Sequence, residues 1–341
     1  MIITKSIKFS RILRWTWHHI TYLLLGAALI AYLYRIGVIT ITIPWLPISV
    51  IGTAVAFYIS FKNNSAYDRL WEARKIWGAI VNSSRAWGSY VDGFVTEQFH
   101  PNGQDLAMIK QRLIYRHIAW LYALRSQLLV ATSWEHSSQK GATGKVGRMY
   151  QKKFGIGLVD DEVTRVELKD LLPPQEHDRL VGHVNTATQI INEQARDLRK
   201  LRADNLIDDF RHMEMMQVLY HFYEHQGKCE RIKKFPLPRQ YANISNVFIW
   251  IFLLLLPFSM IPELMHTGDL GFFLSVPLTA LIGWVYISME LIGDYSENPF
   301  SGMGNDIPML SLCRTIEIDL REMLGETDLP PAIQAKNGIL M

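Results

Sequence analysis

A long apolar stretch near the start of the chain constrains the fold most. Residues 15–34 contain no Asp, Glu, Lys or Arg, and about 20 apolar residues are what an α-helix needs to cross the hydrocarbon core of a bilayer. Three further apolar segments follow at 46–61, 247–261 and 272–292. The segment 46–61 is shorter than the first one and is rich in small and hydroxyl residues, which suits close helix packing or the lining of a passage. The sequence therefore predicts an all-α membrane protein with four transmembrane helices.

The distribution of positive charge predicts how these helices are oriented. Residues 1–14 carry Lys and Arg but no acid, whereas residues 240–313 contain no Lys or Arg. Because positive residues mark the cytosolic side of a membrane, both termini are expected in the cytosol. The expected domains are an N-terminal cytosolic segment with membrane helices 1 and 2, a cytosolic helical domain, membrane helices 3 and 4, and a cytosolic C-terminal segment, at residues 1–61, 62–244, 245–294 and 295–341.

Composition excludes several other classes of protein. The chain has 341 residues, of which 20% are charged and 11% aromatic, so a disordered or low-complexity chain is excluded. Two cysteines, Cys229 and Cys313, cannot form a disulfide framework. The net charge of +3 argues neither for nor against a polyanionic partner. No nucleic acid is expected as a partner. No phosphate-binding loop or nucleophile elbow occurs in the sequence, so catalysis is not expected.

The section between the apolar pairs is expected to be helical. Apolar residues recur at helical intervals over 67–94 and again over 105–131, and residues 118–131 are predicted to form a buried helix. Residues 136–148 contain three glycines and no clear period, so they are predicted to be a loop. A helical pattern resumes over 181–223. The positions that define the first of these patterns are Tyr67, Leu70, Trp71, Trp77, Ile80, Val81, Trp87, Val91 and Phe94.

One short motif favours a different function. His221, Glu224 and His225 match the H-x-x-E-H pattern of some zinc peptidases, with Cys229 one turn further along the same face. A catalytic zinc needs a third protein ligand, and nothing downstream supplies an obvious one. A polar helix face is the preferred interpretation, and a membrane-anchored zinc hydrolase is kept as the alternative.

The second apolar segment places four notable side chains on one side of a helix. Ser49, Thr53, Phe57 and Phe61 follow each other at four-residue steps. If several copies of this helix surrounded an axis, they would form a narrow tube with hydroxyl groups at the outer end. At the inner end, the phenyl groups of all copies would form two successive rings. Such a constriction can gate by dewetting, and the positive edges of phenyl rings tolerate an anion better than a cation. Spacing alone favours the other interpretation, in which both phenylalanines simply pack between helices.

The residues after this helix resemble a known family. The run from Phe61 to Gly78, FKNNSAYDRLWEARKIWG, is similar to the stretch after the second membrane helix of the bestrophin family, especially its short prokaryotic branch. Three further pieces agree in order. They are QGKCERI followed by FPLP within 226–238, ENPF followed by NDIP within 297–308, and DLPP at 328–331. Together these pieces cover nearly the whole chain.

The resemblance implies a homopentamer in a lipid bilayer, with one central pore for monovalent ions. It places the hydrophobic neck of that pore at Thr53, Phe57 and Phe61, with Ser49 lining the outer part. It places a second constriction, the cytosolic aperture, at Phe210. An aliphatic residue is commoner in the family where Thr53 stands, so the outermost ring of this neck is expected to be wetter.

The resemblance leaves the permeant ion open. Phe57 and Phe61 favour anions such as chloride, whereas Asp208 and Asp209 beside the aperture would favour a monovalent cation if they face the axis. Animal members of the family carry a dense acidic cluster directly after the N-P-F motif, but here the six residues that follow it, SGMGND, contain one carboxylate, Asp306. No cofactor or bound metal is therefore expected. The expectation is an ion channel in a bacterial inner membrane, and a non-conducting scaffold is a further alternative.

Overall fold

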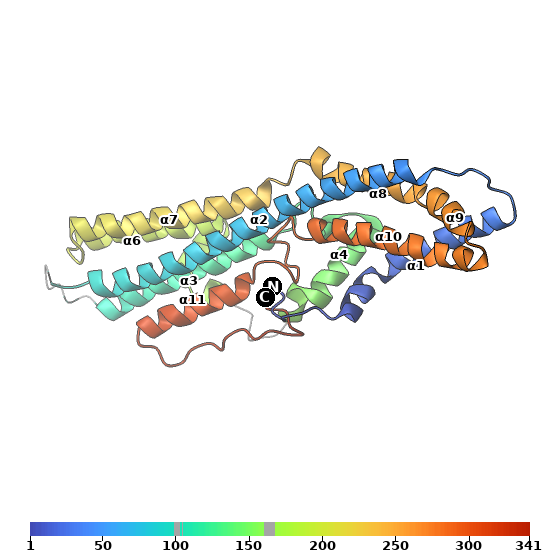
Figure 1. Ribbon diagram of the computed structural model, residues 1–341. Coiled ribbons are helices and arrows are strands. Elements are labelled where there is room, and N and C mark those ends of the chain that lie inside the picture. The colour runs from blue at the N-terminus through green and yellow to red at the C-terminus, as the bar shows by residue number, and fades with distance from the viewer. Residues whose placement is uncertain (99–102, 104, 160–167) are drawn as a thin grey trace. The chain divides into compact units, whose positions relative to one another are not determined.

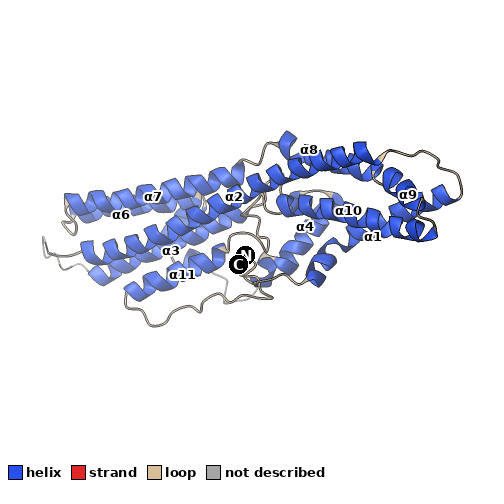
Figure 2. Cartoon of the chain, in the orientation of Figure 1, coloured by secondary structure: helices blue, strands red, loops and turns tan. Residues whose placement is uncertain are grey.

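A computed structural model describes residues 1–98, 103, 105–159 and 168–341, and within these residues it contains helices and no β-strand (Figure 1). Figure 2 shows the helices joined by loops. The α-helices are α1 (Phe9–Arg35), α2 (Trp45–Phe94), α3 (Leu106–Leu129), α4 (Gly141–Phe154), α5 (Pro174–Val181), α6 (Thr186–Ala203), α7 (Asp209–Lys234), α8 (Arg239–Leu255), α9 (Pro257–Met265), α10 (Asp269–Asp294) and α11 (Met309–Met323). Short 3₁₀ helices are η1 (His136–Ser138), η2 (Ile156–Val159) and η4 (Leu168–Asp170).

The chain forms two compact units. The first, here called the bundle unit, consists of residues 1–3, 70–235 and 298–341. The second, here called the apolar-helix unit, consists of residues 4–69 and 236–297. Helix α2 contributes residues to both units, because it runs without a break from Trp45 to Phe94.

Among the described residues, four helical stretches are long and apolar enough to cross a membrane, as the sequence predicts. They begin and end at residues 9–35, 45–94, 209–265 and 269–294. The third apolar segment is formed by two helices, because α8 ends at Leu255 and α9 begins at Pro257. Proline is favoured at the first position of a helix, where its missing N–H is not needed.

A regular stripe of buried residues packs α2 into the apolar-helix unit. The spacing of the stripe follows the 3.6-residue period of an α-helix. Its apolar members contact a core formed with α8 and α10, which includes Ile249, Phe252 and Ile287. The opposite side of α2 therefore faces away from the core of this unit. The buried residues of the stripe are Ile48, Gly52, Val55, Ile59, Lys62 and Ala66.

Large aromatic side chains form the centre of the bundle unit. Trp77 and Trp87 of α2 are fully buried with Trp120 of α3 and Phe222 of α7. Helix α3 also packs against α6 and α11. Residues 118–124 of α3 are buried, which confirms the first half of the buried helix predicted over 118–131. The second half is less buried than predicted, since α3 ends at Leu129 and Val130 is exposed.

Both cysteines are free thiols in the core of the bundle unit. Cys229 and Cys313 are buried there among apolar side chains. Burial raises the pKa of the Cys313 thiol to about 12, so this thiol stays protonated at neutral pH.

The loop predicted at 136–148 is wrong over most of its length, because α4 begins at Gly141. Two of its three glycines lie against neighbouring backbone. A Cβ atom on Gly144 would lie 1.8 Å from the carbonyl oxygen of Gln139, and one on Gly147 would lie 2.8 Å from the carbonyl carbon of His136. Glycine at these positions therefore lets the helix approach the backbone of η1 closely.

Two other predicted patterns are helical, as expected, and the structure adds detail to each. The helix expected over 67–94 is the second half of α2, but Tyr67 and Trp71 of its apolar pattern are exposed within the subunit. The helical pattern over 181–223 is formed by more than one helix, because α6 ends at Ala203 and α7 begins at Asp209. Asn205 turns the chain with a φ of 58°, a value that ends a helix.

Stability of the bundle unit should depend on pH through His117. Its Nε2 donates to the Ser84 hydroxyl at 2.9 Å, since that hydroxyl itself donates to the Ile80 carbonyl. Burial lowers the pKa of His117 to about 3, whereas the unfolded chain titrates near 6.5. The stability of the wild type should therefore fall as the pH drops below about 6.5. Relative to His117→Gln, the loss between pH 7 and pH 5 should be about 2 kcal/mol.

Chemical unfolding in detergent at several pH values measures this difference. The glutamine side chain of the variant cannot titrate, so the two stability curves should converge towards acid pH. Parallel curves would contradict a neutral His117 in the folded protein.

Candidate functional site

The exposed side of α2 carries the four residues that the sequence singled out. Thr53, Phe57 and Phe61 are exposed and Ser49 is half-buried. The phenyl side chains are 64% and 62% exposed at positions 57 and 61. They are therefore not packing residues within one subunit, which is the interpretation that spacing alone favoured. In a folded subunit such phenyl groups must be covered by lipid, by another protein chain, or by the lumen of a passage.

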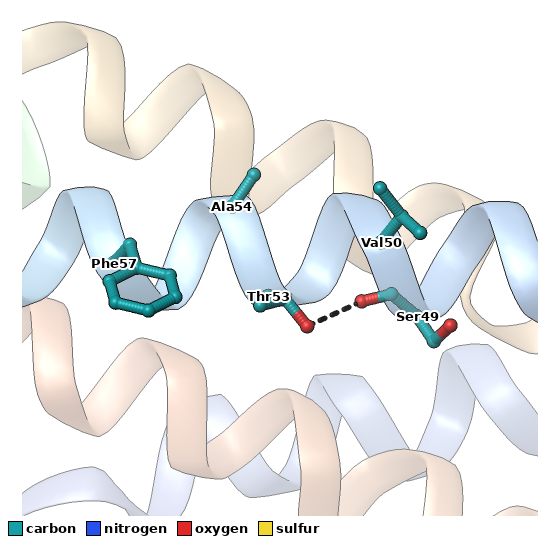
Figure 3. A pocket seen from close by; sticks show the side chains of 5 residues that line it. All are labelled: Ser49, Val50, Thr53, Ala54 and Phe57. Atoms are coloured by element: carbon teal, nitrogen blue, oxygen red, sulfur yellow. Dashed lines mark hydrogen bonds between the residues drawn. The ribbon is translucent and has the colours of Figure 1, made fainter.

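An open pocket of about 350 Å³ lies along this side of α2 (Figure 3). Its lining combines two hydroxyl side chains with three apolar ones. These residues are Ser49, Val50, Thr53, Ala54 and Phe57. The polar end of the pocket thus lies about one turn before the aromatic end, as the order of residues in the sequence requires.

Both hydroxyl groups in this pocket bond back to their own helix. The Thr53 hydroxyl donates to the Ser49 carbonyl at 2.8 Å, the bond drawn in Figure 3. The Ser49 hydroxyl donates to the Leu46 carbonyl, also at 2.8 Å. Such back-bonding uses the hydroxyl hydrogen and leaves oxygen lone pairs facing outward. These two residues can therefore accept hydrogen bonds from water, but they do not offer a donor to an anion in this conformation.

Phe210 lies in the first turn of α7 and its side chain is 86% exposed. The two acidic residues before it are both engaged. The Asp208 carboxylate caps α7 by accepting from the Arg211 backbone N–H at 2.9 Å, and its other oxygen lies 3.6 Å from the Arg211 guanidinium. Asp209 forms an ion pair with Arg202. Both negative charges next to Phe210 are thus balanced by arginine side chains of the same subunit.

The zinc-peptidase motif does not assemble into a metal site. Glu224 accepts from Lys228 at 2.7 Å and lies 3.5 Å from His221, while His225 is turned towards the Ser83 hydroxyl at 3.3 Å. Across the residues that the structure describes, no group of three or more His, Cys, Asp or Glu side chains is placed to hold a metal ion. The motif is a polar helix face in the part of α7 that carries it.

A buried ion pair next to Phe61 was missed by the motif analysis. The Lys62 ammonium bonds to the Glu290 carboxylate of α10, and both side chains are nearly inaccessible to solvent. Two signals in the sequence point to it. Lys62 directly follows the apolar segment, and Glu290 is an isolated acid in the fourth one. Ionisable residues inside membrane segments usually pair with one another.

Comparison with known proteins identifies the family. The chain matches the family described as Bacterial/Fungal Bestrophin protein over residues 3–322. This chain belongs to the bacterial and fungal bestrophin family.

Named relatives and a solved structure agree with this membership. The chain is 27% identical over 315 residues to the voltage-dependent anion channel-forming protein YneE of Escherichia coli, covering 89% of this chain and 88% of the relative. It is 28% identical over 297 residues to the voltage-dependent anion channel-forming protein mll4386 of Mesorhizobium japonicum, covering 87% and 78%. The crystal structure of a bacterial bestrophin homologue from Klebsiella pneumoniae superposes with a TM-score of 0.68, covering 91% of this chain and 98% of that one at 22% identity. The all-α bestrophin fold is thus confirmed, and the printed names of these relatives are those of channel-forming proteins and not of enzymes.

Proposed function

We propose that this chain is the subunit of a bestrophin-type channel that conducts monovalent anions such as chloride across a bacterial inner membrane. The family membership and the printed names of the relatives support an anion channel. The observation that carries the proposal in this chain is the exposed pair Phe57 and Phe61 on α2, opposite the buried stripe of the same helix.

The proposed assembly is a homopentamer in which the exposed sides of five α2 helices surround one axis. Thr53, Phe57 and Phe61 would then form the neck, with Ser49 at its outer end. Two successive rings of phenyl groups would exclude water while the neck is narrow and admit it when the neck widens. This change in wetting would act as the gate.

The proposed cytosolic aperture is Phe210, where Asp208 is paired with the Arg211 side chain and Asp209 with Arg202. Both termini and residues 62–244 are proposed to lie in the cytosol, since the basic flanks favour that orientation. An ion would then pass the neck first and the aperture second on its way into the cell.

Reversal potentials under a salt gradient test the selectivity. In a planar bilayer with a tenfold KCl gradient, a perfectly selective monovalent pore reverses about 59 mV from zero, and the sign gives the charge of the ion. We expect reversal on the chloride side, because phenyl edges presented to the axis of the proposed neck would tolerate an anion better than a cation and the acids near Phe210 lie beside arginines. Reversal on the potassium side would favour the alternative, a monovalent cation channel of the same fold.

A further inference from the structure

The buried ion pair of Lys62 and Glu290 lies directly behind the proposed neck. Lys62 follows Phe61 in α2, and its side chain is 1% exposed. The Ser245 hydroxyl of α8 approaches the same carboxylate oxygen, Glu290 Oε1, at 2.9 Å. The other oxygen, Glu290 Oε2, is buried and has no hydrogen-bond partner among the described residues. Three helices therefore meet at one carboxylate, and that carboxylate keeps a second acceptor position.

Further contacts fix the rotation of α2 against α10 on both sides of the aromatic residues. The Tyr286 hydroxyl donates to the Gly52 carbonyl at 2.9 Å, and the Asn63 side-chain amide donates to the Met289 carbonyl at 3.0 Å. Residues 286, 289, 290 and 293 of α10 share one face. These polar contacts, together with the ion pair, form a seam along the two helices.

Glycine at position 293 lets this seam close. A Cβ atom there would lie 2.0 Å from Asn63 Oδ1. The α10 backbone therefore approaches α2 closely at the turn that follows Phe61.

A buried charge pair is not the simplest way to pack helices. Removing two charges from water is costly, and well-packed apolar residues of similar size often stabilise a protein as well or better. A charge pair does, however, fix the relative orientation of the two helices, because leaving an ammonium or a carboxylate unpaired in an apolar environment is costly. A rotation of α2 that moved Phe61 away from its present direction would have to separate Lys62 from Glu290.

We propose that Lys62 and Glu290, with Ser245, form a latch that holds the rotation of α2 and thereby sets the width of the neck at Phe61. The inference rests on the proposed channel function. Lys62 and Glu290 are positioning residues that act through Phe61 and do not contact the permeant ion. Releasing the pair lets α2 rotate, so the neck spends more of its time wide and wetted.

Single-channel recording of Glu290→Gln and Lys62→Met in planar bilayers tests the latch. Both variants remove one charge with little change in side-chain size. The open probability at a fixed voltage should rise roughly fivefold or more, the lower range of typical coupling between a remote group and a functional site. The sign of the reversal potential should stay as in the wild type, because the residues that line the neck are unchanged. The exchanged pair K62E/E290K restores opposite charges and should return the open probability towards that of the wild type.

Two further variants keep the test decisive. Asp269→Asn disrupts the exposed pair of Asp269 with Arg35, whose atoms are 3.7 Å apart in the same unit, and should leave the open probability unchanged. If Glu290→Gln fails to assemble, Ser245→Ala removes the hydroxyl from Glu290 and should raise the open probability to a smaller extent.

Assembled Glu290→Gln and Lys62→Met channels with wild-type open probability would overturn the latch, even if their unfolding temperatures fell, because that result indicates a purely structural pair. Failure of the channel proposal itself would look different. In that case Phe57→Ala would also leave the currents unchanged, or the wild type would carry no current.

Discussion

Replacing Phe57 with alanine is expected to raise the single-channel conductance or the resting leak roughly tenfold, because each 1.36 kcal/mol removed from a barrier multiplies a rate by ten. In the proposed homopentamer, five benzyl groups would disappear from the neck at once, and a wider, wetted passage would replace a dewetted one. Purified protein in planar bilayers, with currents scaled to the amount of assembled channel, measures the effect.

A matched control separates the neck from other exposed aromatic residues. Phe273 of α10 is 67% exposed, similar to Phe57, but lies outside the proposed neck. Phe273→Ala should therefore leave the conductance unchanged. Equal currents from the wild type and Phe57→Ala would remove Phe57 from the conduction path.

Replacing Trp120 with alanine should lower the free energy of unfolding of the bundle unit by about 3–5 kcal/mol, the usual cost of deleting a buried aromatic side chain. The indole is 1% exposed and its ring centre lies 4.9 Å from that of Phe222. Its N–H donates to the Gln226 side-chain carbonyl at 3.1 Å. Alanine would leave a cavity and an amide oxygen without this donor.

The conservative variant Trp120→Phe dissects that loss. It keeps most of the ring volume and removes the N–H donor, so it should cost about 1–2 kcal/mol. Thermal or denaturant unfolding in detergent measures both variants. If Trp120→Ala lost less free energy of unfolding than Trp120→Phe, the site would have collapsed around the smaller side chain. That result would contradict a tightly packed core.

The sequence predicts those parts of the fold that depend on the order of neighbouring residues. Apolar length predicts the membrane helices, and the four-residue spacing from Ser49 to Phe61 places those side chains along one side of α2. The same approach fails over 136–148. Gly144 and Gly147 led to the prediction of a loop, whereas in the structure they lie in a helix and allow close contact with η1. Glycine is compatible with a loop and with a closely packed helix, and the choice depends on a neighbouring segment that the local sequence does not identify.

Contacts between distant segments could not be predicted in the same way. Lys62 and Glu290 are 228 positions apart, so no local period relates them, and each alone resembles an ordinary end or interruption of an apolar segment. The exposure of Phe57 also depends on which side of α2 finds a partner in the fold. Its role in the neck stays a prediction, since that role depends on other copies of the chain.

The concealment of both native thiols has a practical consequence for the study of this protein. A thiol must ionise and reach its reagent before it reacts, and Cys229 and Cys313 are fully enclosed. A cysteine introduced at position 57 or 61 would therefore be the reactive one in an otherwise unaltered chain. Spin labels or fluorophores attached there could report distances between subunits during gating, without prior removal of the natural cysteines.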